Sequence, residues 1–153
     1  MKSLSHPAAV IRGVAEGRLR AGDLRVLAVV LATELAARAG ITFGTIPGAR
    51  RRIARLRPVL NVMLGPARDD RVLRTLDAIE RRGVGTCLTR ALAAEGLLAS
   101  AGSTTLVIGV AQSGSTSRLD AHAWLEVDRR IVVGGASSTS RYRPFMAWNS
   151  ERR

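Results

Sequence analysis

A change of pattern near Gly102 limits the fold of this chain more than any other feature. Before it, apolar residues recur at helical spacing between capping and stop residues, whereas short β-branched and alternating runs follow it. Helices first and strands afterwards predict an α+β architecture with a small antiparallel sheet. The 153 residues, 46% of them hydrophobic, are enough for one buried core, so we expect a single domain over 1–153, mainly helical over 1–82.

The individual elements follow from periodicity and capping residues. Helices are predicted over residues 7–19, 23–39, 50–60, 69–82 and 86–101. We expect Gly40 to end the second of these helices, a loop to follow over residues 41–48, and Pro58 to disturb the third helix. Strands are predicted over residues 104–110, 121–127 and 130–133, with Asp128 and Arg129 as the hairpin turn between the last two.

The chain is strongly basic. Its formal net charge is +12, and all but Lys2 of its 24 basic residues are arginine. These arginines form several separate short clusters without neighbouring aromatic residues, which favours solvated basic faces over a nucleic-acid surface. A non-enzymatic basic adaptor that binds nucleic acid or an acidic protein is kept as an alternative hypothesis.

The sequence also bears on the cellular setting. The apolar run over residues 26–37 is interrupted by Thr33 and Glu34 and is too short to cross a bilayer, so no membrane span is expected. The N-terminus lacks the pattern of a secretory signal. Cys87 is the only cysteine, which excludes an internal disulfide and argues against a structural zinc site. We therefore expect a cytoplasmic protein without a cofactor.

Cys87 lies where the last predicted helix begins, directly after a tight connection over residues 83–85. Free amides and the positive end of the helix dipole stabilise a thiolate, which is the reactive form of cysteine, and the same amides can stabilise an oxyanion. A free cysteine is also often just a small buried hydrophobic residue, so Cys87 alone does not indicate catalysis. Arg90, one turn further along, is expected to pair with Glu95 or another nearby acid, and contact with the carbonyl groups of a bound peptide is the alternative.

His122 lies in the alternating strand and shares its face with Asp120, Trp124 and Glu126, whereas the opposite face is apolar. A helix-start cysteine followed by a strand histidine is the arrangement of a cysteine nucleophile and its general base. Asp120 is the nearer carboxylate on that face, roughly 7 Å along the strand, and is the candidate third catalytic residue. Trp124 is expected to pack beside His122 and shield it.

Short motifs around both residues carry a family resemblance. They are Cys87-Leu88-x-Arg90-x-Leu92-Ala93 and the strands over residues 106–110 and 121–127, continued by residues 132–135 and 142–144. Together they resemble the lasso-peptide leader peptidase family, whose fold is that of transglutaminase-like and papain-like cysteine proteases. The resemblance implies a cysteine-protease-like core over 83–153. It also implies that Cys87 is the nucleophile and His122 the general base in cleaving the leader from a ribosomally synthesised lasso-peptide precursor.

The resemblance further implies partners and reveals one departure. Residues 1–80 do not resemble the winged-helix module that recognises leaders, so we expect a stand-alone peptidase that works with a precursor leader peptide, a separate recognition protein and an ATP-dependent lasso cyclase. Such proteases usually orient the imidazole with a carboxylate or amide on the next strand, and none stands there. A backbone carbonyl or Ser137 is the alternative to Asp120. A thiol-dependent acyltransferase is the alternative activity, because pocket shape and water exclusion select the acceptor.

Overall fold

The computed structural model describes residues 21–65, 69–98, 102–112, 119–135 and 139–150. Within these residues the helices come first: α2 (Ala21–Thr42), α3 (Ile46–Leu64), α4 (Asp69–Arg81) and α5 (Cys87–Leu97). The strands follow: β1 (Thr104–Gln112), β2 (Leu119–Val127), β3 (Arg130–Val133) and β4 (Arg143–Ser150). This order confirms the predicted α+β architecture. The predicted helix over residues 7–19 lies outside the described residues.

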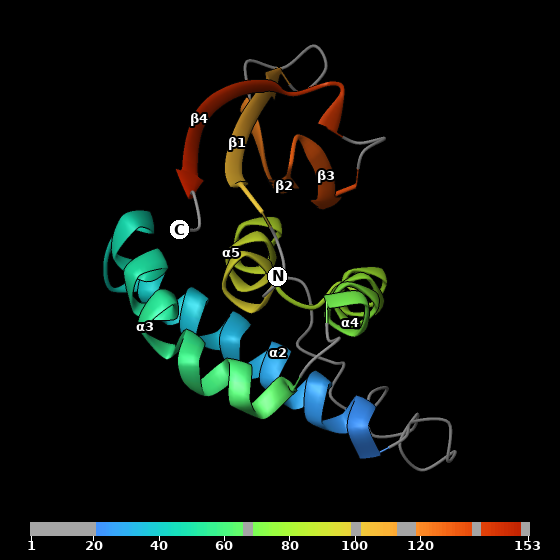
Figure 1. The fold of residues 1–153 in the computed structure, drawn as a ribbon. Helices are drawn as coiled ribbons and strands as arrows, with labels where there is room; N and C mark the ends of the chain where they lie inside the picture. Colours follow the sequence, from blue (N-terminus) through green and yellow to red (C-terminus); the bar gives the residue numbers. More distant parts are fainter. Residues whose placement is uncertain (1–20, 66–68, 99–101, 113–118, 136–138, 151–153) are drawn as a thin grey trace.

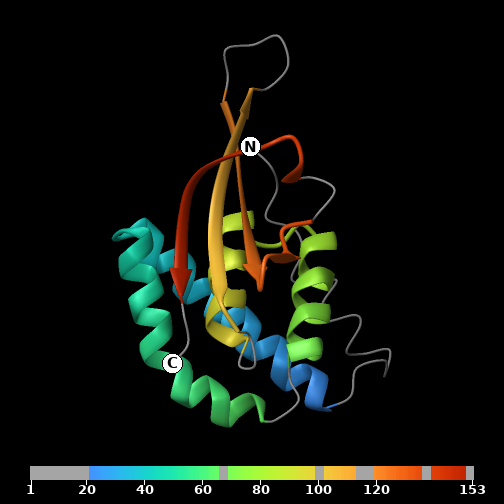
Figure 2. The same cartoon turned by 45° about the horizontal axis from the view of Figure 1, so that its top comes forward.

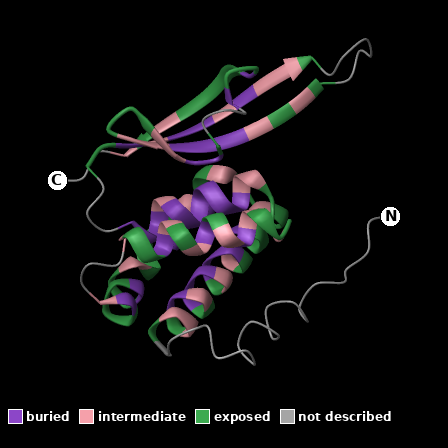
Figure 3. Ribbon diagram, turned by 90° about the vertical axis from the view of Figure 1, so that its right-hand side faces the viewer, coloured by how far each residue is buried: buried purple, intermediate pink, exposed green. Residues whose placement is uncertain are grey.

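The strands form one antiparallel sheet in the order β3-β2-β1-β4. The sheet covers one side of α5, while α2, α3 and α4 surround its other sides (Figures 1 and 2). Most residues of α5 are buried, as the colouring of Figure 3 shows. The helix that begins with Cys87 is therefore the central element of the fold.

The core joins this helix to the sheet. Leu92 and Leu97 of α5 belong to the same cluster as Leu106 of β1 and Leu125 of β2, and each of these leucines is at most 1% exposed. Burial of one such side chain stabilises the fold by about 1.5–3 kcal/mol. The packing fixes the position of α5, and hence of its first residue, relative to β2.

The bounds of α2 and α3 differ from the prediction. Gly40 does not end α2, because it is a contact point: a Cβ on Gly40 would lie 2.8 Å from the Cβ of Ala49 in α3. The third helix starts earlier than expected, at Ile46 after the N-cap Thr45, and continues through Pro58. Pro58 is exposed, so water can bond the carbonyl that its missing N–H leaves without a donor.

The C-terminal half is closer to the prediction. Asp128 and Arg129 have φ values of 46° and 66°, as a two-residue hairpin turn of type I′ requires, and β3 has the expected bounds. Helix α5 ends at Leu97, earlier than expected, because the buried Leu98 takes an extended conformation. The prediction missed β4, most of whose side chains are exposed.

Candidate active site

Thr86 caps α5 and places Cys87 as its first residue. The Thr86 hydroxyl accepts a hydrogen bond from the amide of Thr89 at 3.2 Å, and the Thr89 hydroxyl accepts one from the amide of Thr86 at 3.0 Å. This reciprocal capping box uses two of the amides that a helix start leaves free. Cys87 itself is half-buried. The structure confirms the predicted helix-start position of the thiol.

His122 is held by a backbone carbonyl. Its Nε2 lies 2.7 Å from the carbonyl oxygen of Gly134, the residue that follows β3. A carbonyl oxygen only accepts hydrogen bonds, so Nε2 carries the proton and Nδ1 of the neutral ring keeps its lone pair. The structure therefore presents Nδ1 as the nitrogen that can act as a base.

The backbone at Gly134 has a conformation that favours glycine. Its φ is +103°, and a Cβ on this residue would lie 2.6 Å from the Cβ of Trp124. Gly134 can thus bring its carbonyl beside His122 only because it has no side chain.

Two aromatic rings fix the plane of the imidazole. Tyr142 stacks on His122 with 5.1 Å between ring centroids, and Trp124 stacks at 6.3 Å. Trp124 is 4% exposed, and its Nε1 donates to Glu126 Oε1 at 2.9 Å. The expected packing of Trp124 beside His122 is confirmed, whereas the role of Tyr142 was not predicted.

Asp120 bonds elsewhere. Its Oδ2 accepts hydrogen bonds from the Tyr142 hydroxyl at 2.8 Å and from Arg141 Nη2 at 2.7 Å, and the described hydrogen bonds include none between Asp120 and His122. The side-chain hydrogen bond with Tyr142 and the nearby charges raise the pKa of Arg141. Asp120 thus reaches the imidazole through Tyr142, whose ring stacks on His122, and its catalytic role stays a prediction. Ser137, the other side-chain candidate, lies outside the described residues.

The sheet separates the environments of His122 and Cys87. Val107 and Trp124, which face each other across β1 and β2, pack with Tyr142 in a cluster distinct from the main core. His122, two residues from Trp124, shares that face, whereas α5 packs on the opposite face. Within the described part of the chain no hydrogen bond joins the Cys87 thiol to His122. The structure brings His122 to Gly134, but it does not bring it into bonding contact with Cys87.

A buried ion pair is formed by Arg90, three residues after Cys87 in α5, and Glu34 of α2. Arg90, 5% exposed, donates from Nη2 to the carbonyl oxygen of Val84 at 2.7 Å, and its guanidinium faces Glu34 and Glu80. Burial raises the pKa of the Glu34 carboxyl, and the charge of Arg90 partly offsets this. Of the two pairings expected for Arg90, the one with another nearby acid is confirmed and the one with Glu95 is wrong.

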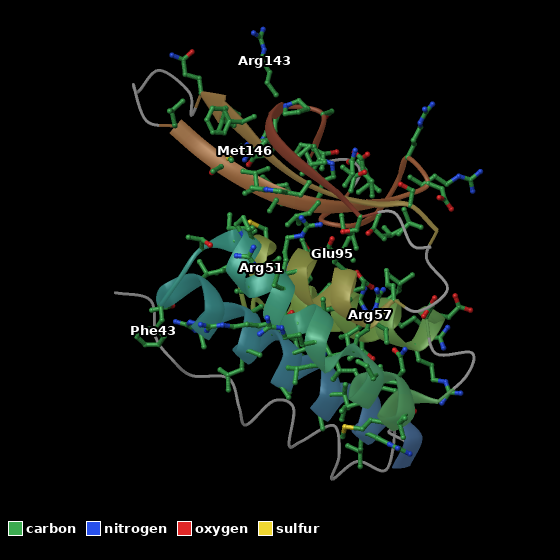
Figure 4. All side chains as sticks on the ribbon, turned by 60° about the vertical axis from the view of Figure 1, so that its left-hand side comes forward. Phe43, Arg51, Arg57, Glu95, Arg143 and Met146 are labelled. Carbon is green, nitrogen blue, oxygen red and sulfur yellow. The ribbon has the colours of Figure 1, made fainter. Side chains whose placement is uncertain are left out.

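Glu95 belongs to a groove between α3 and α5. Arg50 binds its carboxylate through Nε at 2.9 Å and Nη2 at 2.5 Å, and Ser150 donates to it at 3.0 Å. The groove has a volume of about 290 Å³ and is also lined by Arg51 and Arg57 of α3, which flank Glu95 in Figure 4. With three arginines in its lining, Arg50, Arg51 and Arg57, this groove is strongly basic.

Two further grooves lie close to the candidate residues. One, of about 300 Å³, is bounded by Leu31 and Leu35 of α2 and by Val84 and Gly85 just before Cys87. The other, of about 370 Å³, runs between α4 and β3 and reaches Gly134. Gly134, the bonding partner of His122, thus borders one of these spaces, and two residues that shortly precede Cys87 border the other.

Some functions receive no support from the described residues. No cluster of three or more His, Cys, Asp or Glu side chains that could hold a metal ion occurs among them. In the same part of the chain, no helix combines the length and apolar character that crossing a membrane requires.

A thiol at the start of a buried helix, packed on an antiparallel sheet that carries a histidine, is consistent with a transglutaminase-like core. Comparison with protein families agrees: residues 26–147 match the family described as the transglutaminase-like superfamily. The chain belongs to this superfamily, which indicates a cysteine-dependent enzyme. No curated protein and no solved structure gave a match.

Proposed function

We propose that this chain is a cysteine peptidase that removes the leader from a ribosomally synthesised lasso-peptide precursor, with Cys87 as nucleophile and His122 as general base. The observation that carries the proposal is the bond from His122 Nε2 to the Gly134 carbonyl, because it leaves Nδ1 available for the thiol proton. The family membership and the helix-start position of Cys87 support the same assignment.

In the proposed reaction, Nδ1 of His122 takes the proton from the Cys87 thiol. The thiolate then attacks the carbonyl carbon of the scissile peptide bond, and amides at the start of α5 stabilise the oxyanion. The imidazolium returns its proton to the leaving amine as the C–N bond breaks. Water, deprotonated by His122, hydrolyses the resulting thioester and regenerates the thiol.

This reaction requires the thiol and the imidazole to meet. Strand β3 pairs only with residues 125–127 of β2, so the part of β2 that carries His122 extends beyond the paired edge. We propose that the two groups approach each other at this edge when a peptide binds. Catalytic hydrogen bonds that are long or poorly aligned without substrate often tighten in the complex.

The remaining expectations belong to the same proposal. The chain acts in the cytoplasm, with a separate winged-helix recognition protein that delivers the leader and an ATP-dependent cyclase that takes the core peptide. Asp120 serves as a positioning residue that holds Tyr142 against the imidazole.

The test is incubation of the purified chain with a candidate precursor, with and without the recognition protein, followed by mass spectrometry. We expect release of the leader, and a loss of about a thousandfold or more in Cys87→Ala and His122→Ala. Circular dichroism should show that both variants remain folded. Leader release by Cys87→Ala would overturn the proposal.

An acyltransferase would use the same two residues but would pass the acyl group to an amine. Adding a primary amine to the incubation distinguishes the two activities. A peptidase yields the free carboxylate with or without the amine, whereas an acyltransferase yields the amide.

A further inference from the structure

The segment before Cys87 is tied to the interior by one side chain. Arg90 bonds the carbonyl of Val84 at 2.7 Å, and Val84 precedes the thiol-bearing residue by only three positions. Glycines with positive φ stand on both sides of Val84, at 67° for Gly83 and 76° for Gly85. A connection with two such glycines has little stiffness of its own. The bond from Arg90 restrains it together with a backbone bond from the Val84 amide to the Ile79 carbonyl at 3.2 Å.

Glu34 of α2 restrains the same segment from the other side. A Cβ on Gly85 would lie 2.3 Å from Glu34 Oε2, so the buried carboxylate packs directly against the backbone at Gly85. Glu34 is 6% exposed and faces Arg90, with 3.9 Å between its Oε1 and Arg90 Nε. The guanidinium and the carboxylate therefore contact the connection at two neighbouring points, Val84 and Gly85.

The geometry of the Glu34–Arg90 pair is unfavourable for stabilising the fold. Glu34 Oε1 and Arg90 Nε are buried and have no hydrogen-bond partner. Unbonded buried charged groups cost free energy, and a buried pair is weak evidence for stability. The Arg50–Glu95 pair, which joins α3 to α5, is different, because two hydrogen bonds join its members and none of them involves the connection.

We propose that Arg90 and Glu34 are positioning residues for the Cys87 thiol: together they hold residues 84–86 so that the start of α5 keeps its amides directed at the sulfur. The inference rests on the proposed role of Cys87 as nucleophile. It assigns the pair a function in thiol reactivity that differs from its contribution to folding.

Cys87 is the only cysteine of the chain, so alkylation by iodoacetamide reports on this one atom without any substrate. The rate constant is measured over a range of pH for the full chain and for Arg90→Gln, Glu34→Gln and the double variant. Arg50→Gln and Glu95→Gln are the matched controls, because they break an ion pair that joins α5 to α3 and does not involve the connection. Urea unfolding gives the stability of each protein.

We expect Arg90→Gln to be less stable, and both single variants to lose about tenfold or more in alkylation rate at neutral pH, since small displacements at a reactive centre have large effects. The controls should lose stability but keep the rate. The double variant, which leaves no buried charge unpaired, should regain stability without regaining reactivity. If one variant does not fold, Arg90→Lys, which keeps the charge but not the planar donor set, takes its place.

Unchanged alkylation in folded single variants, or recovery of both properties in the double variant, would overturn the inference. The outcome is independent of the leader-cleavage assay. A chain that cleaves no precursor but depends on Arg90 for alkylation contradicts the proposed function alone.

Discussion

His122 and Gly134 are joined by a bond of 2.7 Å between an imidazole nitrogen and a main-chain carbonyl. In the usual arrangement a carboxylate or amide side chain takes this place. A carbonyl orients the ring and fixes its tautomer, but it adds no negative charge next to an imidazolium. The pair therefore provides orientation without the electrostatic contribution of a third acid.

Gly134→Ala is expected to disturb both the backbone and the site. The φ of +103° and the contact with Trp124 oppose any Cβ, so the free energy of unfolding should fall by about 1–3 kcal/mol. Leader cleavage should fall as well, because the carbonyl moves away from His122. Gly65→Ala is the control: its φ is also positive, at 72°, but a Cβ there meets nothing within 4 Å, so stability alone should change. Equal cleavage by both variants would contradict the prediction.

Asp120→Asn and Tyr142→Phe should have small and similar effects on cleavage, less than about tenfold. Each change weakens the Tyr142–Asp120 hydrogen bond but keeps the ring that stacks on His122. Tyr142→Ala removes the ring and should cost more. Steady-state kinetics of the three variants check this order. A loss in Asp120→Asn as large as that in His122→Ala would mean that Asp120 acts on the imidazole directly.

Thr86→Ala removes the cap of α5 and should lower the free energy of unfolding by about 1 kcal/mol. Thr45→Ala is matched to it, because Thr45 caps α3 with a hydrogen bond of the same 3.2 Å length. Both variants should lose similar stability, but only Thr86→Ala should slow the alkylation of Cys87. Equal alkylation rates in the two variants would show that the cap does not affect the thiol.

Glu34 should make stability depend on pH. Burial raises the pKa of its carboxyl in the folded state above the usual value of 4.5, so the folded protein holds the proton more tightly than the unfolded chain. Its favourable contribution is complete below 4.5 and is lost as pH rises through the raised pKa. Urea unfolding should therefore show wild type losing stability relative to Glu34→Gln over this window. A difference that does not vary with pH would contradict the prediction.

Local patterns were sufficient where one segment determines its own structure. The helix-start position of Cys87 and the Asp128-Arg129 turn were predicted correctly because helix-start and turn signals act within a few positions. The sequence does not encode the acceptor for His122 in a side chain, since every residue has a carbonyl. The one sequence signal for an unusual backbone at this point is the glycine pair after β3, Gly134 and Gly135.

The errors have tertiary causes. Gly40 carries a stop signal but serves as a contact point for Ala49, which no local pattern reveals. Strand β4 lacks alternation because most of its side chains are exposed, and it exists through its pairing with β1. Glu34 contacts Arg90, which lies 56 residues further along the chain. Tyr142 contacts His122, which lies 20 residues before it. Local sequence patterns do not report contacts over such separations.

Strand β4 has a consequence for the behaviour of the protein in solution. It is an edge strand, and it exposes Phe145 and Met146, a combination that invites pairing with the edge of another molecule. Its first two residues oppose such pairing, because Arg143 carries a charge and Pro144 has no N–H to donate. Replacing these two residues would remove the barrier to aggregation at this edge while leaving the core unchanged.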